Sequence, residues 1–228
     1  MKTQKELLSD TKTRIMDVAE RLFTKKGFQG TSIKRLAREA KVNQAAVNYY
    51  FGSKAALIEK VIDRRLGPVT EQRMRRLESL RLAADWKGGS PLAEDVLRAF
   101  IEPAFIMNSH MQEHRCILAL AAWAFSESDE KIKSIFLRHF IPPFRLLVGA
   151  MKEALSEVPE DVLVRRLHFA IGAMTHGFQQ CGISLLPHDL LPPVGDVRTI
   201  TELLLEFVTS GMIAPCHGES RNMLRSAS

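Results

Sequence analysis

Two short helical patterns separated by a three-residue break lie between residues 31 and 54, and they limit the folds that this chain can adopt. The first pattern follows Ser32, whose hydroxyl can cap a helix, and its apolar residues keep helical spacing. Lys41-Val42-Asn43 forms the break, and Asn43 can cap a second helix over about 44–51. Two helices joined by so short a turn predict a helix-turn-helix unit.

The second of these helices has two different faces at about 100° per residue. One face collects four polar or small residues: Gln44, Ala45, Asn48 and Tyr49. The opposite face carries Ala46, Val47 and Tyr50, which can pack on the first helix. Amide side chains suit adenine edges in the DNA major groove. The pattern favours DNA reading over its alternative, a polar surface helix in an all-α domain.

The charge of the chain is concentrated around this segment. Residues 1–66 hold 15 Lys and Arg against 7 Asp and Glu, a net charge of +8, whereas the remaining residues hold 17 against 19. The whole excess of positive charge therefore lies in the first part of the chain, which favours a polyanionic partner for that part. The alternative is a basic face that serves only solubility.

The remaining patterns are helical as well. An amphipathic helix over about 10–26 precedes Gly27 and Phe28, and another follows Ser53 until Gly67-Pro68, where we expect a bend or a break. That kink is either passive or part of a mechanism. After a loop at 84–91, helical patterns follow at about 92–109, 113–126, 129–156, 160–185 and 196–213. Pro142-Pro143 must bend or split the third of these. With no strand alternation, the sequence predicts an all-α fold.

A long run of residues keeps the order and spacing of a known signature. It reads Gly27-Phe28-x-x-Thr31-Ser32-Ile33-x-x-Leu36-Ala37-x-x-Ala40-x-Val42-x-x-x-x-Val47-x-Tyr49-Tyr50-Phe51-x-Ser53-Lys54-x-x-Leu57. This run resembles the N-terminal signature of the TetR family of transcriptional regulators. The resemblance implies an all-α homodimer, with a helix-turn-helix DNA-binding domain at residues 1–66 and an effector-binding and dimerisation domain at residues 67–228.

The resemblance also implies roles for single residues. Gln44 and Ala45 match base-reading positions, and Tyr49 and Tyr50 match positions that contact bases or backbone. Lys54 matches a lysine that grips phosphate.

Two further positions match phosphate contacts, and two depart from the family pattern. Thr31 and Ser32 match the phosphate contacts, which also suit the exposed N–H groups of a helix N-terminus. Ala46 stands where the family often has Thr, and Asn48 where it often has Tyr. Asn48 can read a base instead.

Aromatic and sulfur-containing side chains recur at helical spacing in the middle of the chain. By pattern alone they form an ordinary helical core, whereas the resemblance implies a cavity for a small apolar effector. The residues that we expect to line it are Phe105, Met107, Met111, Trp123, Phe140 and Phe144. Basic side chains that could anchor an acidic head group are Arg115, Arg138, His139 and Arg145.

The sequence argues against a metal site or an active site. His110, His114 and Cys116 have spacing that could hold zinc, but no fourth ligand lies nearby and Cys116 is off the face that the histidines share. Hydrolase, metalloprotease, dinucleotide-binding and P-loop motifs do not occur. We therefore expect no metal, no cofactor and no enzymatic activity.

Two apolar helices near the end of the chain predict a homodimer. The patterns at about 160–185 and 196–213 are apolar on more than one face and need a partner surface. The resemblance predicts that two helices from each subunit form a four-helix interface. Without a signal-like N-terminus or a span of about 20 apolar residues, and with three widely spaced cysteines that we expect to be reduced, we expect a cytoplasmic chain that does not enter a membrane.

Short segments are also similar to the PsrA-type subgroup, whose members are associated with fatty-acid metabolism. They are Leu66-Gly67-Pro68, Ala124-Phe125-Ser126, Arg166-x-His168-Phe169-x-Ile171-Gly172-Ala173 and Gly211-Met212. The prediction as a whole is a repressor that binds an inverted-repeat operator on double-stranded DNA and is released by a fatty acid or an acyl thioester. The alternatives are a carrier of apolar ligands that does not touch DNA and, after it, an enzyme acting on hydrophobic acids.

Overall fold

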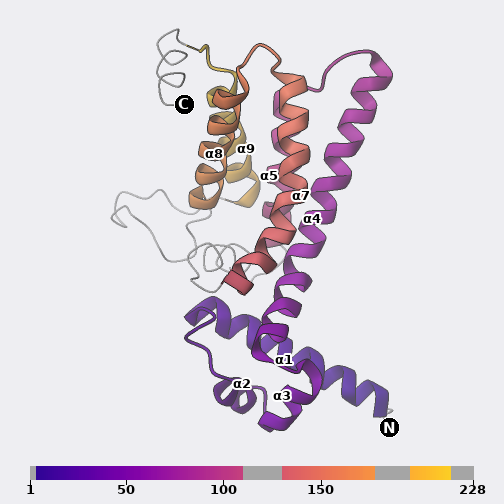
Figure 1. The fold of residues 1–228 in the computed structure, drawn as a ribbon, viewed down its shortest axis with the longest axis vertical. Coiled ribbons are helices and arrows are strands. Elements are labelled where there is room, and N and C mark those ends of the chain that lie inside the picture. The colour runs from indigo at the N-terminus through magenta and orange to yellow at the C-terminus, as the bar shows by residue number, and fades with distance from the viewer. Residues whose placement is uncertain (1–3, 110–129, 178–195, 217–228) are drawn as a thin grey trace. The chain divides into compact units, whose positions relative to one another are not determined.

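The computed structural model describes residues 4–109, 130–177 and 196–216, and every regular element in these ranges is an α-helix (Figure 1). The helices are α1 (Gln4–Lys26), α2 (Ile33–Glu39), α3 (Gln44–Phe51), α4 (Lys54–Lys87), α5 (Ala93–Ser109), α7 (Glu130–Ala154), α8 (Glu160–Gly177) and α9 (Val197–Ile213). The predicted all-α fold is confirmed. The helical pattern at about 113–126 and the end of the pattern at 160–185 lie outside the described residues.

Two helix ends differ from the sequence prediction. Helix α1 starts at Gln4, earlier than the expected start near residue 10. Helix α4 continues to Lys87, so the loop begins at Gly88 and not at residue 84. Gly88 ends the helix because its φ of 64° suits glycine, and the N–H groups of Gly88 and Gly89 donate to the carbonyls of Asp85 and Ala84 at 3.1 Å.

Prolines lie inside α4 and α7 without breaking them. Pro68 is internal to α4, so the predicted break at Gly67-Pro68 does not occur. Helix α7 also runs unsplit through Pro142-Pro143. Because Pro143 has no N–H, it cannot donate to the carbonyl of His139 one turn earlier. The Thr70 hydroxyl of α4 donates to that carbonyl instead, at 3.0 Å, which helps α7 to remain continuous.

The described residues form two compact units. The first contains residues 4–71, 106–109 and 130–142, and the second contains residues 72–105, 143–177 and 196–216. Helices α4, α5 and α7 each pass from one unit to the other, and each carries a proline near the crossing: Pro68, Pro103 and Pro142-Pro143. Residues 130–142 therefore pack with the N-terminal unit, whereas the functional division at residue 66 stays a prediction.

An apolar core holds the first unit together. Phe23 of α1 and Phe28, which follows that helix, are both buried, and their ring centroids lie 5.4 Å apart. Phe28 is thus part of the core of this unit. Leu36 of α2, Val47 of α3 and Leu57 of α4 complete the contact between the helices. Burial of each such side chain stabilises the fold by roughly 1.5–3 kcal/mol, which positions the short helix α3.

The second unit buries one apolar face of each of its helices. Its core includes Leu77, Leu97, Phe100, Leu147, Ala150, Met151, Leu163, Leu167, Met174, Leu204 and Val208. Helices α8 and α9 pack against each other, as Figure 1 also shows. Within the described ranges, no helix combines the length and the apolar character needed to cross a bilayer.

Candidate DNA-binding surface

Local hydrogen bonds build the helix-turn-helix between residues 32 and 53. The Ser32 hydroxyl accepts from the Arg35 N–H at 3.2 Å, and the Asn43 side chain accepts from the Ala46 N–H at 2.7 Å. Both residues are extended at the N-cap, as the sequence predicted. Between the helices Lys41 adopts a positive φ of 53°, which turns the chain tightly. Capping thus fixes where α2 and α3 begin, and the turn at Lys41 separates them.

Helix α3 presents the predicted polar face to solvent. Gln44, Ala45 and Asn48 are exposed, and Tyr49 is 80% exposed. On the opposite face Val47 is buried, and Ala46 and Tyr50 are half-buried. The predicted partition of the helix is therefore confirmed. An exposed aromatic ring beside two exposed amides is a surface that folding alone does not require.

The two tyrosines of α3 contact each other. Their ring centroids lie 5.3 Å apart in an edge-to-face arrangement, and the Tyr50 ring lies 6.4 Å from that of buried Phe51. Through this series of rings, the core orients the exposed Tyr49. Gly52 then ends the helix with a φ of 73°, and Ser53 caps α4 by accepting from the Ala56 N–H at 3.1 Å.

The four predicted backbone contacts have different environments. Ser32 is exposed, and Tyr50 and Lys54 are half-buried. Thr31, in contrast, is completely buried, and its hydroxyl donates to the Gly27 carbonyl at 3.1 Å. This burial argues against the predicted phosphate contact by the Thr31 side chain. The hydroxyl closes the turn after α1, and a phosphate contact through the backbone N–H groups of this turn stays a prediction.

Three exposed cations near the helix pair were not singled out from the sequence: Lys34, Arg38 and Lys41. In the sequence, only the positive net charge of the N-terminal segment pointed to these three residues. Arg21 and Arg35 are not free in the same way, since both donate to Glu39, at 2.6 and 2.9 Å. These hydrogen bonds from Arg21 and Arg35 lower the pKa of Glu39, so the carboxylate stays ionised and offsets part of the local positive charge.

Polar contacts from α1 and α4 support the helix pair. The Arg14 Nε of α1 donates to the Ala40 carbonyl at 2.9 Å and so satisfies the C-terminal end of α2. Glu20 of α1 is buried, and its two carboxylate oxygens lie 2.5 Å from Arg64 and Arg65 of α4. Arg64 also pairs with Asp17 at 2.8 Å. The reading helix thus rests on a scaffold joined by hydrogen bonds and ion pairs.

Models of protein families match two parts of the chain. The model of bacterial regulatory proteins of the tetR family matches residues 15–61, and a model of tetracyclin repressor-like C-terminal domains matches residues 98–211. The chain belongs to the TetR family. The matched regions contain the helix-turn-helix and most of the helices that follow α4.

Several HTH-type transcriptional regulators share part of the sequence. The probable HTH-type transcriptional regulator YttP of Bacillus subtilis (strain 168) is 44% identical over 52 residues, which are 23% of this chain and 25% of YttP. The HTH-type transcriptional regulator HbdR of Aromatoleum sp. (strain CIB) is 30% identical over 78 residues, 34% of each chain. The uncharacterised regulator YerO of B. subtilis is 27% identical over 151 residues, 66% of this chain and 48% of YerO. The matches thus span between a quarter and about half of these relatives.

Solved structures of transcriptional regulators share the fold over most of the chain. HlyIIR, a hemolysin II transcriptional regulator, has a TM-score of 0.63 at 19% identity, covering 91% of this chain and 99% of HlyIIR. FadR from B. subtilis, solved in complex with stearoyl-CoA, has a TM-score of 0.61 at 15% identity, covering 87% and 98%. At such low identity the likeness shows the fold alone.

The residues predicted to line an effector cavity lie at scattered positions. Phe105 is buried on α5, and Phe140 and Phe144 are half-buried on α7. Phe140 stacks on Phe136, with centroids 6.1 Å apart. Met107 belongs to the backbone of α5. Met111 and Trp123 lie outside the described residues. The effector lining therefore stays a prediction.

Two of the predicted polar anchors already have partners in the structure. Arg138 pairs with Glu59 at 2.5 Å, and the His139 Nε2 lies 2.9 Å from an Asp63 carboxylate oxygen. Arg145 is exposed. Arg115, like His110, His114 and Cys116, lies outside the described residues.

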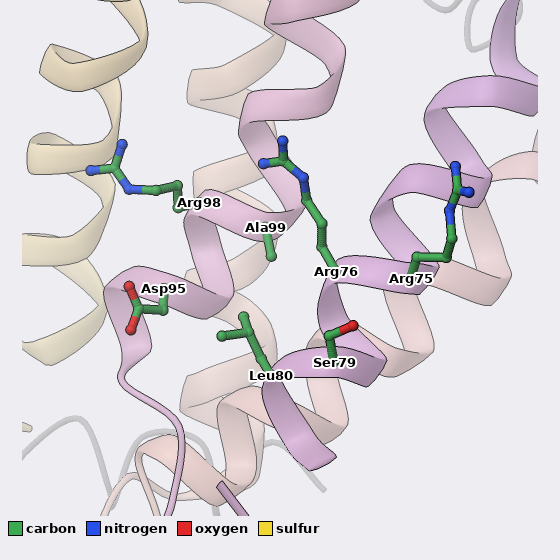
Figure 2. Close-up of a pocket in the computed structure, with 7 residues that line it drawn as sticks. All are labelled: Arg75, Arg76, Ser79, Leu80, Asp95, Arg98 and Ala99. Carbon is green, nitrogen blue, oxygen red and sulfur yellow. The ribbon is translucent and has the colours of Figure 1, made fainter. Parts of the chain in front are cut away.

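One hollow in the second unit lies between α4 and α5 and has a volume of about 450 Å³. Figure 2 shows the side chains that line it: Arg75, Arg76, Ser79, Leu80, Asp95, Arg98 and Ala99. Arg76 pairs with Glu102, and Arg98 pairs with Glu202 at 2.6 Å. Hydrogen bonds from Glu202 and Glu94 raise the pKa of Arg98 further above its usual range. Charged and polar residues therefore provide most of the lining, although the surface that they expose to the hollow is largely apolar, and none of the six predicted lining residues belongs to it.

A second hollow, of about 590 Å³, lies between α8 and α9 and is largely apolar. Its lining includes Phe169, Leu203 and Phe207, which are 66%, 61% and 70% exposed. Val164 and Ile213 add further exposed apolar area on the same two helices. So large an apolar face is typical of a protein interface.

Proposed function

We propose that this protein is a homodimeric transcriptional repressor that inserts α3 into the major groove of an inverted-repeat operator and is released by a small apolar effector. The observation that carries the proposal is the exposed face of α3 in a chain of the TetR family. That face holds Gln44, Ala45, Asn48 and Tyr49 at the centre of the basic segment. Such a regulator would act in the cytoplasm.

The contacts can be divided by chemistry. Gln44 and Asn48 would read bases through their amides, Ala45 would allow close approach, and Tyr49 would contact a base or the backbone. Ser32, Tyr50 and Lys54 would hold phosphates. Thr31 would help to position these phosphate-binding residues through the turn after α1, because its hydroxyl already donates to the Gly27 carbonyl.

The first experiment is a mobility-shift assay with the promoter of the protein's own gene. We expect a specific complex at low salt that requires two half-sites about 34–36 Å apart or at multiples of that distance. Gln44→Ala should relax sequence preference at one base pair and cost about 1–3 kcal/mol there. Lys54→Ala should weaken binding to all sequences alike and reduce the salt dependence.

Lys87→Ala is the matched control, because it removes an exposed lysine at the other end of α4. It should leave DNA affinity unchanged. If Gln44→Ala and Lys54→Ala weaken specific and random DNA equally, the assigned roles are wrong. If wild-type protein forms no specific complex, a carrier of apolar ligands becomes the better proposal.

The dimer would form through the apolar face of α8 and α9. A second copy of the chain would cover Phe169, Leu203 and Phe207 and give the two reading helices that an inverted repeat needs. Phe207→Glu should convert the dimer to a monomer in analytical ultracentrifugation. Leu92→Glu is the control, because Leu92 and Phe207 are equally exposed at 70%, and it should leave the dimer intact.

The effector would be a fatty acid or an acyl thioester. Two observations support this class: the similarity of short segments to the PsrA-type subgroup, and the shared fold with FadR, a structure that contains stearoyl-CoA. Added effector should dissociate the operator complex in the mobility-shift assay. A complex that persists with every acyl compound tested would remove this class of effector from the proposal.

A further inference from the structure

Arg73 lies in the apolar interior of the second unit. It belongs to α4, it is only 8% exposed, and the neighbouring core residues Leu77, Phe100 and Met174 are buried with it. An arginine is rarely buried to this degree unless a carboxylate compensates its charge. The position therefore needs a physical explanation.

Within the described ranges, the contacts of Arg73 are with neutral groups. Its Nε donates to the Phe100 carbonyl at 2.7 Å, and its guanidinium carbon lies 4.0 Å from the centroid of the Phe100 ring. One N–H of Nη2 points to the Met174 sulfur at 3.8 Å, which is a weak acceptor. A guanidinium has five N–H donors. Among the residues that the structure describes, no carboxylate pairs with this one.

Other arginines of the same unit form ion pairs with carboxylates. Arg81 pairs with Glu153 at 2.8 Å, and Arg98 pairs with Glu202 at 2.6 Å, although both arginines are more exposed than Arg73. Burial lowers the pKa of Arg73 to about 9, so the side chain is still charged at neutral pH. Among the described residues of the unit, this buried positive charge is therefore not compensated by a carboxylate.

We propose that Arg73 is the anchor for the carboxylate of an elongated apolar effector, whose hydrocarbon tail lies along the apolar core of the second unit. This inference rests on the proposed function and specifies its ligand. The planar guanidinium can bind a carboxylate through two parallel N–H bonds. The flexible thioether of Met174 can move aside and release the Nη2 group for that contact.

The same geometry separates the two effector classes. A free fatty acid brings the negative charge that Arg73 lacks, next to a hydrocarbon chain. The carbonyl of an acyl thioester is neutral, and the phosphates of a coenzyme A moiety would lose their hydration in an apolar interior. The protein should therefore prefer the free acid to its coenzyme A thioester.

The test uses the full-length protein and a panel of straight-chain carboxylates from octanoate to octadecanoate, with calorimetry and thermal unfolding as readouts. Dodecanoate, dodecanol and dodecanoyl-CoA form the matched set. Wild-type protein should bind the acid more tightly than the alcohol or the thioester. Arg73→Met should weaken binding of the acid by roughly ten- to a hundredfold and leave binding of the alcohol unchanged.

Arg75→Met is the control, because it removes an exposed arginine two positions away on the same helix. It should bind dodecanoate as wild type does. If Arg73→Met does not fold, Arg73→Lys keeps the charge without the planar fork and should bind the acid with intermediate affinity. The inference is overturned if no carboxylate binds wild-type protein, or if the Arg73 variants bind the acid as tightly as wild type.

The DNA assay keeps this inference separate from the proposed function. Without effector, Arg73→Met should bind the operator with wild-type affinity, and acid should no longer release it. If wild-type protein binds the operator but no carboxylate, the proposed role of Arg73 is wrong and the proposed repressor function is supported. If it binds dodecanoate through Arg73 but no operator, the proposed role of Arg73 is supported and the proposed repressor function is wrong.

Discussion

The two compact units each bury a charged side chain, and they treat it in opposite ways. In the first unit Glu20 is 2% exposed and has two guanidiniums, from Arg64 and Arg65, at 2.5 Å. In the second unit Arg73 contacts only a carbonyl, an aromatic ring and a sulfur among the described residues. Two arginines of the same unit compensate the charge of Glu20, whereas no described carboxylate compensates the charge of Arg73.

The difference indicates two purposes for a buried charge. A paired charge contributes to one arrangement of helices, and removing one partner leaves the other uncompensated and costs stability. An unpaired buried charge costs stability in the free protein and can recover that cost when an anion binds. We therefore interpret Glu20 as a residue that stabilises the fold and Arg73 as a residue that binds an anionic ligand.

The largest effect is expected for Glu20→Gln. This change leaves Arg64 and Arg65 without their shared carboxylate and should lower the free energy of unfolding by about 3 kcal/mol, measured by urea denaturation. Arg73→Met, in contrast, should leave stability unchanged or raise it, because it replaces an unpaired buried charge by an apolar side chain.

Asp17→Asn is the control for that experiment. Asp17 also pairs with Arg64, but its side chain is 60% exposed, so its loss should cost less than about 1 kcal/mol. The comparison between the units breaks down if Glu20→Gln is tolerated, or if Arg73→Met is the more damaging variant.

A smaller effect is expected for Thr70→Val. This change removes the hydroxyl that donates to the His139 carbonyl and leaves that carbonyl without the N–H that Pro143 cannot supply. The cost should be about 2 kcal/mol in denaturant unfolding. Thr70→Ser keeps the hydroxyl and should cost clearly less. Equal losses for Val and Ser would mean that packing, and not this hydrogen bond, matters at the position.

The N-cap of α3 should contribute less again. Asn43→Ala removes the side chain that accepts from the Ala46 N–H and should cost about 1 kcal/mol. Asn43→Ser retains a capping oxygen and should restore most of the loss in thermal unfolding. We expect Asn43→Ala to weaken operator binding as well, because the first turn of α3 carries Gln44 and Ala45. Unchanged operator affinity would show that the cap does not position the reading face.

The smallest effect concerns pH and the N-cap of α9. Backbone and hydroxyl hydrogen bonds from Thr199 lower the pKa of Asp196 below its ordinary value of 3.8. A lowered pKa means that this contribution to stability is complete above pH 3.8 and is lost as the pH falls through the folded-state pKa. Urea unfolding as a function of pH should show this loss in wild type and not in Asp196→Asn, in which residue 196 does not titrate. An identical pH dependence in both proteins would contradict it.

The sequence predicted much of the candidate DNA-binding surface because its signals are local. Capping by Ser32 and Asn43 and the two faces of α3 depend on residues within a few positions of each other. The burial of Thr31 could not be predicted in this way, since it depends on how the turn after α1 folds back. The three exposed cations Lys34, Arg38 and Lys41 could be inferred only as net charge.

What the sequence by itself determined is the helical fold, the capped helix pair and the polar face of α3, because each follows from helical periodicity and from side chains near in sequence. Only the tertiary structure decided how α7 passes Pro143 and which buried charge has no carboxylate partner among the described residues. The Thr70 hydroxyl meets a carbonyl 69 residues away, and Arg73 meets groups 27 and 101 residues away. Such meetings depend on how whole helices pack, and no local pattern specifies them.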